Sequence, residues 1–146
     1  MDKEMIDDIR QFNRFYTKVL GVFNNQILDT NYSLTETRIL FEISERTDCI
    51  ANNIVQELNI DRSYMSRIIR KFEKEALIEK RSSTTDSRKN FLYLTQKGEE
   101  LLNKIHVQSD EQINQLFSGL TDDEINEIHM SMMNIKEKLN QNIKHS

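Results

Sequence analysis

The stretch "DRSYMSRIIRKFEK" at residues 61–74 becomes two-sided when it is wound as a helix of about 100° per residue. Its apolar side is made of Met65, Ile68, Ile69 and Phe72. The opposite side carries Ser63, Arg67, Arg70 and Lys74, flanked by Ser66 and Lys71. Asp61 precedes the stretch's first turn as an N-cap candidate. The pattern predicts a helix over residues 62–75 that buries one side and presents a basic stripe on the other.

Two shorter helices are predicted before this one. Ser33 and Glu36 have the spacing of a capping box, with Thr35 as a rival N-cap. The core positions of the helix that follows are Ile39, Leu40 and Ile43. After a break at residues 47–49, a helix is predicted over residues 50–58. Its inward-facing residues are Ile50, Ile54, Val55 and Leu58. Two short helices joined by a tight turn form a helix-turn-helix pattern, although this turn contains no glycine.

Strand character appears after the basic helix. Residues 77–81 and 90–94 have the composition of strands, and the polar residues 82–89 between them resemble a turn. This predicts a hairpin, or wing. Helical periodicity resumes at Thr95 and continues to a glycine C-cap at Gly119. A first helix over residues 4–28, a turn at 29–33 and a last helix capped by Thr121 and Glu124 complete a mainly α protein with a small β-wing.

Charge is distributed unevenly along the chain. The net charge is −4, but residues 61–97 hold ten Lys or Arg and five Asp or Glu, a local charge of +5, which leaves −9 elsewhere. A basic segment on an acidic body is the electrostatic pattern of a localised polyanion site, although an ordinary solvated surface also gives such a stripe. On double-stranded DNA, we expect Ser63, Ser66, Arg67 and Arg70 to reach bases. Tyr64 lies at the edge of this stripe, and Lys71 and Lys74 are expected to meet phosphates.

The wing has a specific residue spacing, Asp86-x-Arg88-x-x-x-Leu92-x-Leu94-Thr95-x-x-Gly98. This spacing resembles the wing signature of the MarR family of winged helix-turn-helix regulators. Residues 34–40 also resemble that family's second helix, residues 61–73 its recognition helix and residues 77–81 the strand entering its wing. One departure is Ala76, where the family commonly has glycine. Because alanine resists a left-handed turn, we expect the exit from the helix to differ slightly.

The resemblance implies a homodimer in which residues 33–98 form the winged helix-turn-helix part and residues 1–30 and 99–146 form a helical dimerisation part. The wide apolar sides of the terminal helices and the methionines near residue 130 support a dimer independently. In the wing, the resemblance implies Arg88 in a minor groove with Asp86 orienting it, and Lys89 beside them. A solvent-exposed salt bridge of little consequence is the alternative interpretation of the Asp86–Arg88 pair.

The resemblance also implies a small-molecule effector. Its pocket would be lined by aromatic residues, which are equally typical of a packed core. The candidates are Phe12, Phe15, Tyr16 and Tyr32, together with Phe23. Cys49 has a neighbouring acid that disfavours the thiolate, and His106 with Asp110 offers too few ligands for a metal site. We expect no cofactor and no metal, and we find no constellation of catalytic residues.

These observations predict a DNA-binding transcriptional regulator, a homodimeric repressor of a pseudo-palindromic operator that a small molecule releases. The alternative is a winged-helix interaction module that docks an acidic protein partner. The single cysteine and an N-terminus without an apolar signal region predict a cytoplasmic protein. The apolar runs are too short for a membrane span.

Overall fold

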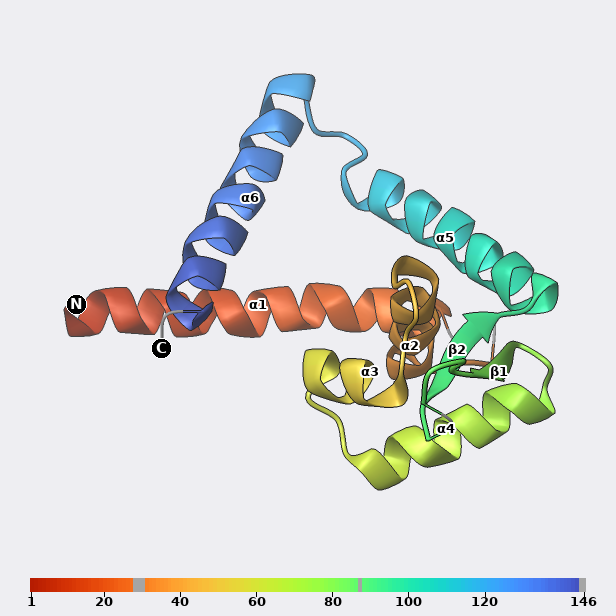
Figure 1. The fold of residues 1–146 in the computed structure, drawn as a ribbon. Coiled ribbons are helices and arrows are strands. Elements are labelled where there is room, and N and C mark those ends of the chain that lie inside the picture. Colours follow the sequence, from red (N-terminus) through yellow and green to blue (C-terminus); the bar gives the residue numbers. More distant parts are fainter. Residues whose placement is uncertain (28–30, 87, 145–146) are drawn as a thin grey trace. The chain divides into compact units, whose positions relative to one another are not determined.

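The computed structural model describes residues 1–27, 31–86 and 88–144, and the side chains of residues 22–27 lie outside its description. The elements follow in the order α1 (Lys3–Ile27), α2 (Leu34–Glu45), α3 (Ala51–Leu58), α4 (Arg62–Lys74), β1 (Ile78–Ser82), β2 (Asn90–Leu94), α5 (Gln96–Leu116) and α6 (Asp122–Lys144) (Figure 1). This is the predicted mainly helical fold with a small β-wing. The chain forms two compact units, residues 1–109 and 110–146, and α5 contributes to both.

The helix-turn-helix is built from α2, α3 and α4. Helix α2 starts with a complete capping box: the Ser33 hydroxyl accepts from the Glu36 N–H at 3.1 Å, and the Glu36 carboxylate accepts from the Ser33 N–H at 3.1 Å. Thr35 therefore lies inside the helix and is not its N-cap. Asn59 has a φ of 51° and ends α3 in the left-handed region, where asparagine substitutes for the glycine that the turn lacks. Asp61 caps α4 as predicted.

The wing is an antiparallel pair that runs from Ile78 opposite Leu94 to Ser82 opposite Asn90. The first strand begins one residue later than predicted, because Leu77 is still part of the helix exit. Residues 47–49, which we expected to be only a break, add an isolated bridge in which the Leu92 N–H donates to the Cys49 carbonyl at 2.7 Å. The middle of β2 is thereby tied to the segment that connects α2 to α3.

The turn between α4 and the wing is left-handed even though it contains no glycine. Ala76 has a φ of 60°, so alanine adopts here the left-handed conformation that we expected it to resist. An L-residue pays about 1–2 kcal/mol for this conformation. The hydroxyl of Thr95 donates to the Ala76 carbonyl at 2.6 Å and helps to hold the turn.

The hydrophobic core lies inside unit 1. It joins the inner sides of α2, α3 and α4 to the wing and to the start of α5, and its members include Ile39, Leu40, Ile54, Met65, Phe72, Leu77, Leu92 and Leu102. All the predicted core positions of α2 and α4 are buried. In α3 only Ile54 is fully buried, while Ile50, Val55 and Leu58 are half-buried.

Helix α5 begins where the wing ends. Thr95 caps it by accepting from the Gly98 N–H at 3.1 Å. A side chain at Gly98 would place its Cβ 2.1 Å from the Leu77 carbonyl oxygen, so glycine is required by close backbone approach. In unit 2, Gly119 has a φ of 86°, and Thr121 with Glu124 forms the predicted capping box of α6.

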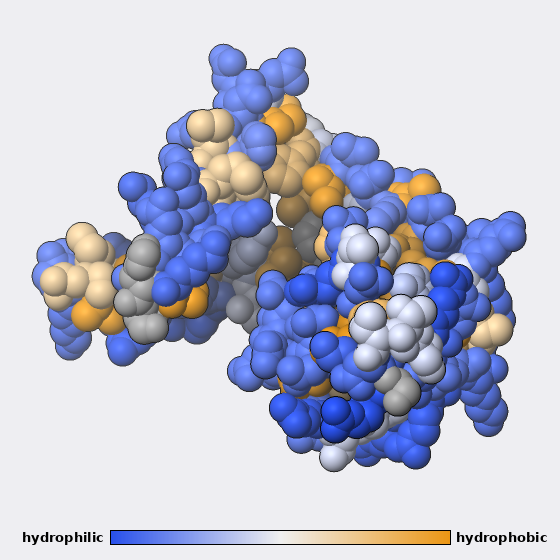
Figure 2. Space-filling view, viewed as in Figure 1, coloured by the Kyte–Doolittle hydropathy of each residue, from blue (hydrophilic) through white to orange (hydrophobic). Residues whose placement is uncertain are grey.

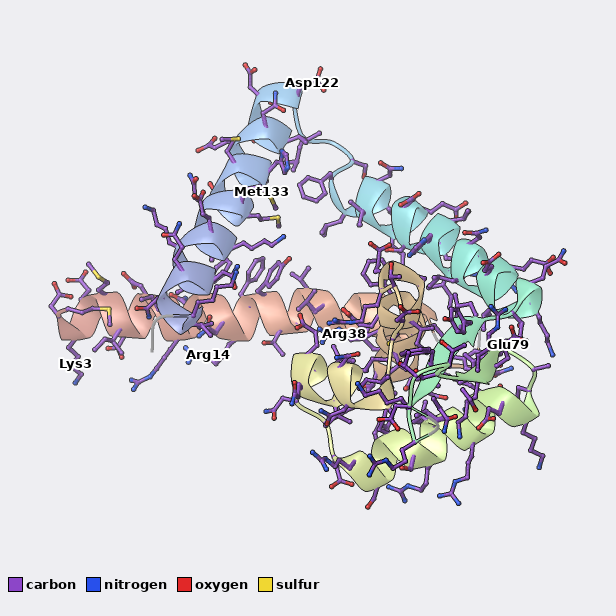
Figure 3. The ribbon with its side chains drawn as sticks, viewed as in Figure 1. Lys3, Arg14, Arg38, Glu79, Asp122 and Met133 are labelled. Atoms are coloured by element: carbon purple, nitrogen blue, oxygen red, sulfur yellow. The ribbon has the colours of Figure 1, made fainter. Side chains whose placement is uncertain are left out.

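The terminal helices contrast with this core. Helix α1 exposes about half or more of Met5, Phe12 and Phe15. Within α6, whose residues are all described, none is buried. Apolar atoms are visible on both helices in Figure 2, and Met133 projects from α6 in Figure 3. The predicted helix end at residue 28 and the turn positions 29 and 30 lie outside the described residues. No helix in the described part of the chain is long and apolar enough to cross a bilayer.

Candidate nucleic-acid interface

Helix α4 has the two sides that its sequence predicts. Met65, Ile68, Ile69 and Phe72 are buried, whereas Ser63, Ser66, Arg67, Arg70 and Lys74 are exposed. The Arg67 guanidinium lies 5.9 Å from the centre of the Tyr64 ring, a cation–π distance, and the Arg70 Nε lies 3.5 Å from the Ser66 carbonyl oxygen. These loose contacts within one helix leave both arginine heads able to reach a polyanion.

Lys71 differs from the other cations of α4. Its Nζ donates to the Glu36 carboxylate at 2.6 Å and lies 5.1 Å from the centre of the Tyr32 ring. The hydrogen bond to Glu36 is the main reason that the pKa of Lys71 is raised. Its ammonium group is therefore paired with a carboxylate of α2, while the phosphate contact expected for Lys71 stays a prediction.

The tip of the wing positions Arg88 through Asp86, as predicted. One carboxylate oxygen of Asp86 accepts from the Arg88 backbone N–H at 3.0 Å and lies 3.5 Å from its Nε. The Arg88 side chain is 92% exposed, so the pair adds little stability in water. Ser83 braces the tip, because its hydroxyl accepts from the backbone N–H groups of Thr85 and Asp86. The arrangement directs a cationic head outward from the hairpin.

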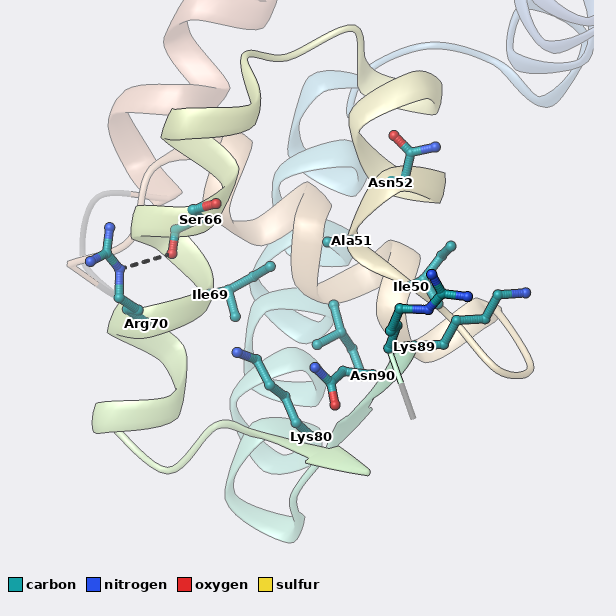
Figure 4. Close-up of a pocket in the computed structure, with 11 residues that line it drawn as sticks. Ile50, Ala51, Asn52, Ser66, Ile69, Arg70, Lys80, Lys89 and Asn90 are labelled. Carbon is teal, nitrogen blue, oxygen red and sulfur yellow. Dashed lines mark hydrogen bonds between the residues drawn. The ribbon is translucent and has the colours of Figure 1, made fainter. Parts of the chain in front are cut away.

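A groove of about 450 Å³ lies between α4, the start of α3 and the wing (Figure 4). It is lined by Ile50, Ala51, Asn52, Ser66, Ile69, Arg70, Lys80, Arg88, Lys89, Asn90 and Leu92. The described side chains of the lining thus contribute four cations and no carboxylate. Of the residues predicted to contact DNA, the groove brings together Ser66 and Arg70 of α4 with Arg88 and Lys89 of the wing.

Three polar residues of this groove were not predicted from the sequence. Lys80 lies on β1, Asn90 at the start of β2 and Asn52 in the first turn of α3. Strand alternation could have indicated Lys80, because Lys80 and its partner Leu92 project from the same side of the hairpin. Asn52 carries no comparable local signal. It borders a second hollow of about 390 Å³, and its side-chain Oδ1 accepts from the Arg62 guanidinium at 3.3 Å.

The proposed effector aromatics do not share one environment. Phe12 and Tyr16 stack on α1 with their ring centres 5.7 Å apart, and Phe15 is 60% exposed. Tyr32 instead packs against Phe72 of α4 with ring centres 6.3 Å apart. Phe23 lies outside the described side chains.

Cys49 is buried, and His106 lies beside an aromatic ring. Cys49 is 1% exposed, and burial raises the pKa of its thiol, which disfavours the reactive thiolate. The ring of His106 contacts Phe41 edge-on, with the ring centres 5.9 Å apart. Among the described residues, no group of three or more His, Cys, Asp or Glu side chains is placed to hold a metal ion.

The helix-turn-helix, the wing and the cationic groove between them define a winged helix-turn-helix protein. Residues 32–89 match the family model described as "MarR family". A curated relative is the HTH-type transcriptional regulator BilQ of Clostridioides difficile strain CD3, which is 29% identical over 67% of this chain and 66% of that protein. Residues 32–89 of this chain are therefore similar to the MarR family, and the curated relative is named as a transcriptional regulator.

Solved structures share the fold of this chain. The MarR family transcription regulator SP03579 superposes with a TM-score of 0.78 at 17% identity, over 98% of this chain and 95% of that one, which shows the fold alone. A protein of Listeria monocytogenes assigned to the same family, solved in complex with a 26mer DNA, has a TM-score of 0.68 at 25% identity over 92% of this chain and 89% of that one.

Proposed function

We propose that this protein is a sequence-specific regulator that binds double-stranded DNA with α4 in a major groove and Arg88 in the neighbouring minor groove. The observation that carries the proposal is the groove between α4 and the wing, whose described lining has four cations and no carboxylate. The likeness to a family member solved with DNA supports it. Arginine suits both positions, because it bonds guanine bidentately and gains from the negative potential of a narrow minor groove.

The major-groove contacts assigned to α4 are Ser63, Ser66, Arg67 and Arg70, with Tyr64 at their edge. Lys74 remains a phosphate contact, whereas Lys71 is already paired with Glu36. On the wing, Lys89 joins Arg88 as a cation of the groove. We add Asn52 as a phosphate-contact candidate, because it lines the same groove, whereas the ammonium group of Lys80 in that lining is paired with the Glu73 carboxylate at 3.2 Å.

The biological unit in this proposal is a homodimer, with residues 33–98 as the DNA-binding part and the helices of residues 1–30 and 99–146 as the dimerisation part. The exposed apolar residues of α1 and α6 support it, because monomers rarely leave such residues uncovered. Two copies would bind a pseudo-palindrome with half-sites about one helical turn, roughly 34–36 Å, apart. Repression, release by a small molecule and a cytoplasmic location rest on the family resemblance.

The test is a titration of wild type, Arg67→Ala and Arg88→Ala against an operator selected from a random DNA pool. Each substitution should weaken operator binding by about 1–3 kcal/mol without loss of dimerisation. Arg10→Ala is the matched control, because Arg10 is an exposed arginine of α1 paired with Asp7 at 3.4 Å. Wild-type affinity in both variants would overturn the assignment. Equal affinity of wild type for operator and random DNA would instead favour the acidic-protein partner.

A further inference from the structure

Four polar side chains form a cluster between the start of α2 and the second half of α4. The cluster consists of Tyr32, Glu36, Lys71 and Glu75. Lys71 donates to Glu36 at 2.6 Å, and the Tyr32 hydroxyl donates to Glu75 at 2.6 Å. These bonds join residues that are 35 and 43 positions apart in sequence. They connect two separate helices and not neighbouring turns of one helix.

The cluster is enclosed and well satisfied at its centre. The Glu36 side chain is 10% exposed, and its second oxygen accepts from the Ser33 N–H at 3.1 Å. Lys71 caps the Tyr32 ring, which packs in turn on Phe72 of the core. Burial alone would raise the pKa of Glu36, but the hydrogen bonds from Lys71 and Ser33 outweigh it and leave that pKa lowered. Glu36 is therefore held as a carboxylate inside the fold.

These hydrogen bonds restrain the orientation of α4, which its apolar side does not do. Met65, Ile68, Ile69 and Phe72 hold the helix against the core by burial, which is strong but not directional. Charge-assisted hydrogen bonds have narrow distance and angle limits. A pair at Lys71 and a second at Glu75, one turn apart, thus restrict both the rotation and the sliding of α4. Serine and arginine heads on the opposite side move with that rotation.

We propose that the cluster is a positioning device that sets the orientation of α4 on DNA, with Glu36 acting through Lys71, and that Lys71 itself contacts no phosphate. This inference rests on the proposed DNA-binding function. Its physical basis is that this pair, with Glu36 10% exposed and Lys71 39% exposed, contributes orientation more than stability, while the loss of Lys71 leaves the nearly buried carboxylate uncompensated. Specificity for the operator, and not the general attraction to DNA, should depend on the cluster.

The experiment measures the affinity of Glu36→Gln, Lys71→Met and the double variant for the selected operator and for random DNA over a range of salt concentrations. We expect each single substitution to lower the operator-to-random affinity ratio about tenfold, and the double variant to cost less than the sum of the two. The salt slope should stay at the wild-type value in all three. Lys71→Arg, which keeps a charged donor for Glu36, should recover most of the ratio.

Lys74→Met is the matched control, because it removes one lysine charge from the same helix without touching the cluster. Its salt slope should fall by about 0.9, the value for one lost phosphate contact. A similar fall in Lys71→Met, with Glu36→Gln unchanged in affinity ratio, would overturn the inference. Failure of wild type to distinguish operator from random DNA would overturn the proposed function instead.

Folding is checked separately by thermal unfolding, with all binding measured well below the midpoint. If Glu36→Gln does not fold, Tyr32→Phe replaces it, because this change removes only the hydroxyl that donates to Glu75. Tyr32→Phe should then lower the affinity ratio severalfold at an unchanged salt slope. An unchanged ratio in this folded variant would contradict the proposal.

Discussion

The winged helix-turn-helix part and helix α6 use their apolar residues in opposite ways. In the first, Ile39, Leu40, Ile54 and Phe72 are completely buried. In α6, no residue is buried, and Ile135, Leu139 and Ile143 are each at least half exposed. Both regions have helical periodicity of apolar residues, so periodicity alone does not distinguish a buried side from an exposed one.

The largest effect should follow from breaking the apolar side of α6. Ile135→Asp combined with Leu139→Asp should weaken the proposed dimer by at least about 100-fold, because burial of each such side chain is worth about 1.5–3 kcal/mol. Sedimentation over a range of protein concentrations measures the change. Asn134→Asp with Gln141→Asp adds the same two charges away from that side and should leave the dimer intact. A monomeric wild type at micromolar concentration would contradict the proposed dimer.

Gly98 tests the close packing of the winged helix-turn-helix part. Gly98→Ala should destabilise the protein by about 1–3 kcal/mol, because its Cβ would meet the Leu77 carbonyl oxygen at 2.1 Å, and a backbone atom cannot easily move aside. Urea unfolding gives the change in free energy. Gly21→Ala in α1, where a Cβ meets nothing within 4 Å, should stabilise its helix by about 0.5–1 kcal/mol. Equal effects of the two substitutions would rule out close approach as the reason for Gly98.

A substitution at Ala76, in the same region, should increase stability. Ala76→Gly should raise the free energy of unfolding by about 0.5–1 kcal/mol, because the left-handed strain of alanine exceeds the extra backbone entropy that glycine loses on folding. The urea midpoint should rise while operator affinity stays unchanged. Ala51→Gly, at the first position of α3, is the control and should destabilise. A lower midpoint in Ala76→Gly would show that the turn is not strained.

The smallest effect concerns alkaline pH. Burial, followed by the hydrogen bond to Glu75, raises the pKa of Tyr32 from 10.0 to about 12. The folded state thus favours the neutral phenol, and this contribution to stability is fully present below pH 10 and is lost as the pH rises towards 12. Wild type should lose more stability than Tyr32→Phe between pH 9 and 11.5, measured by urea midpoints. Parallel losses in the two proteins would show that Tyr32 does not couple to folding.

The local features of this protein could be predicted from its sequence. The two sides of α4, the caps at Ser33, Asp61 and Thr121 and the hairpin at residues 78–94 each depend on residues that are close in the chain. Hydrophobic period, capping spacing and turn composition report such short-range physics directly. The Asp86–Arg88 contact belongs to this group, since its two residues are only two positions apart in the chain.

Contacts between segments that are distant in the chain could not be predicted from the sequence. A lysine on the polar flank of α4 looks free in sequence, and only the fold brings Glu36 to Lys71. The lining of the groove includes Asn52 of α3 and Lys80 of β1, and the fold also places Cys49 beside Leu92 of β2.

By itself, the sequence determined the elements, their inward sides and the basic stripe, because these follow from spacing along the chain. Only the tertiary structure decided which cations are paired with distant carboxylates, because the pairing of a charge depends on neighbours that the fold, and not the sequence order, brings within hydrogen-bonding distance.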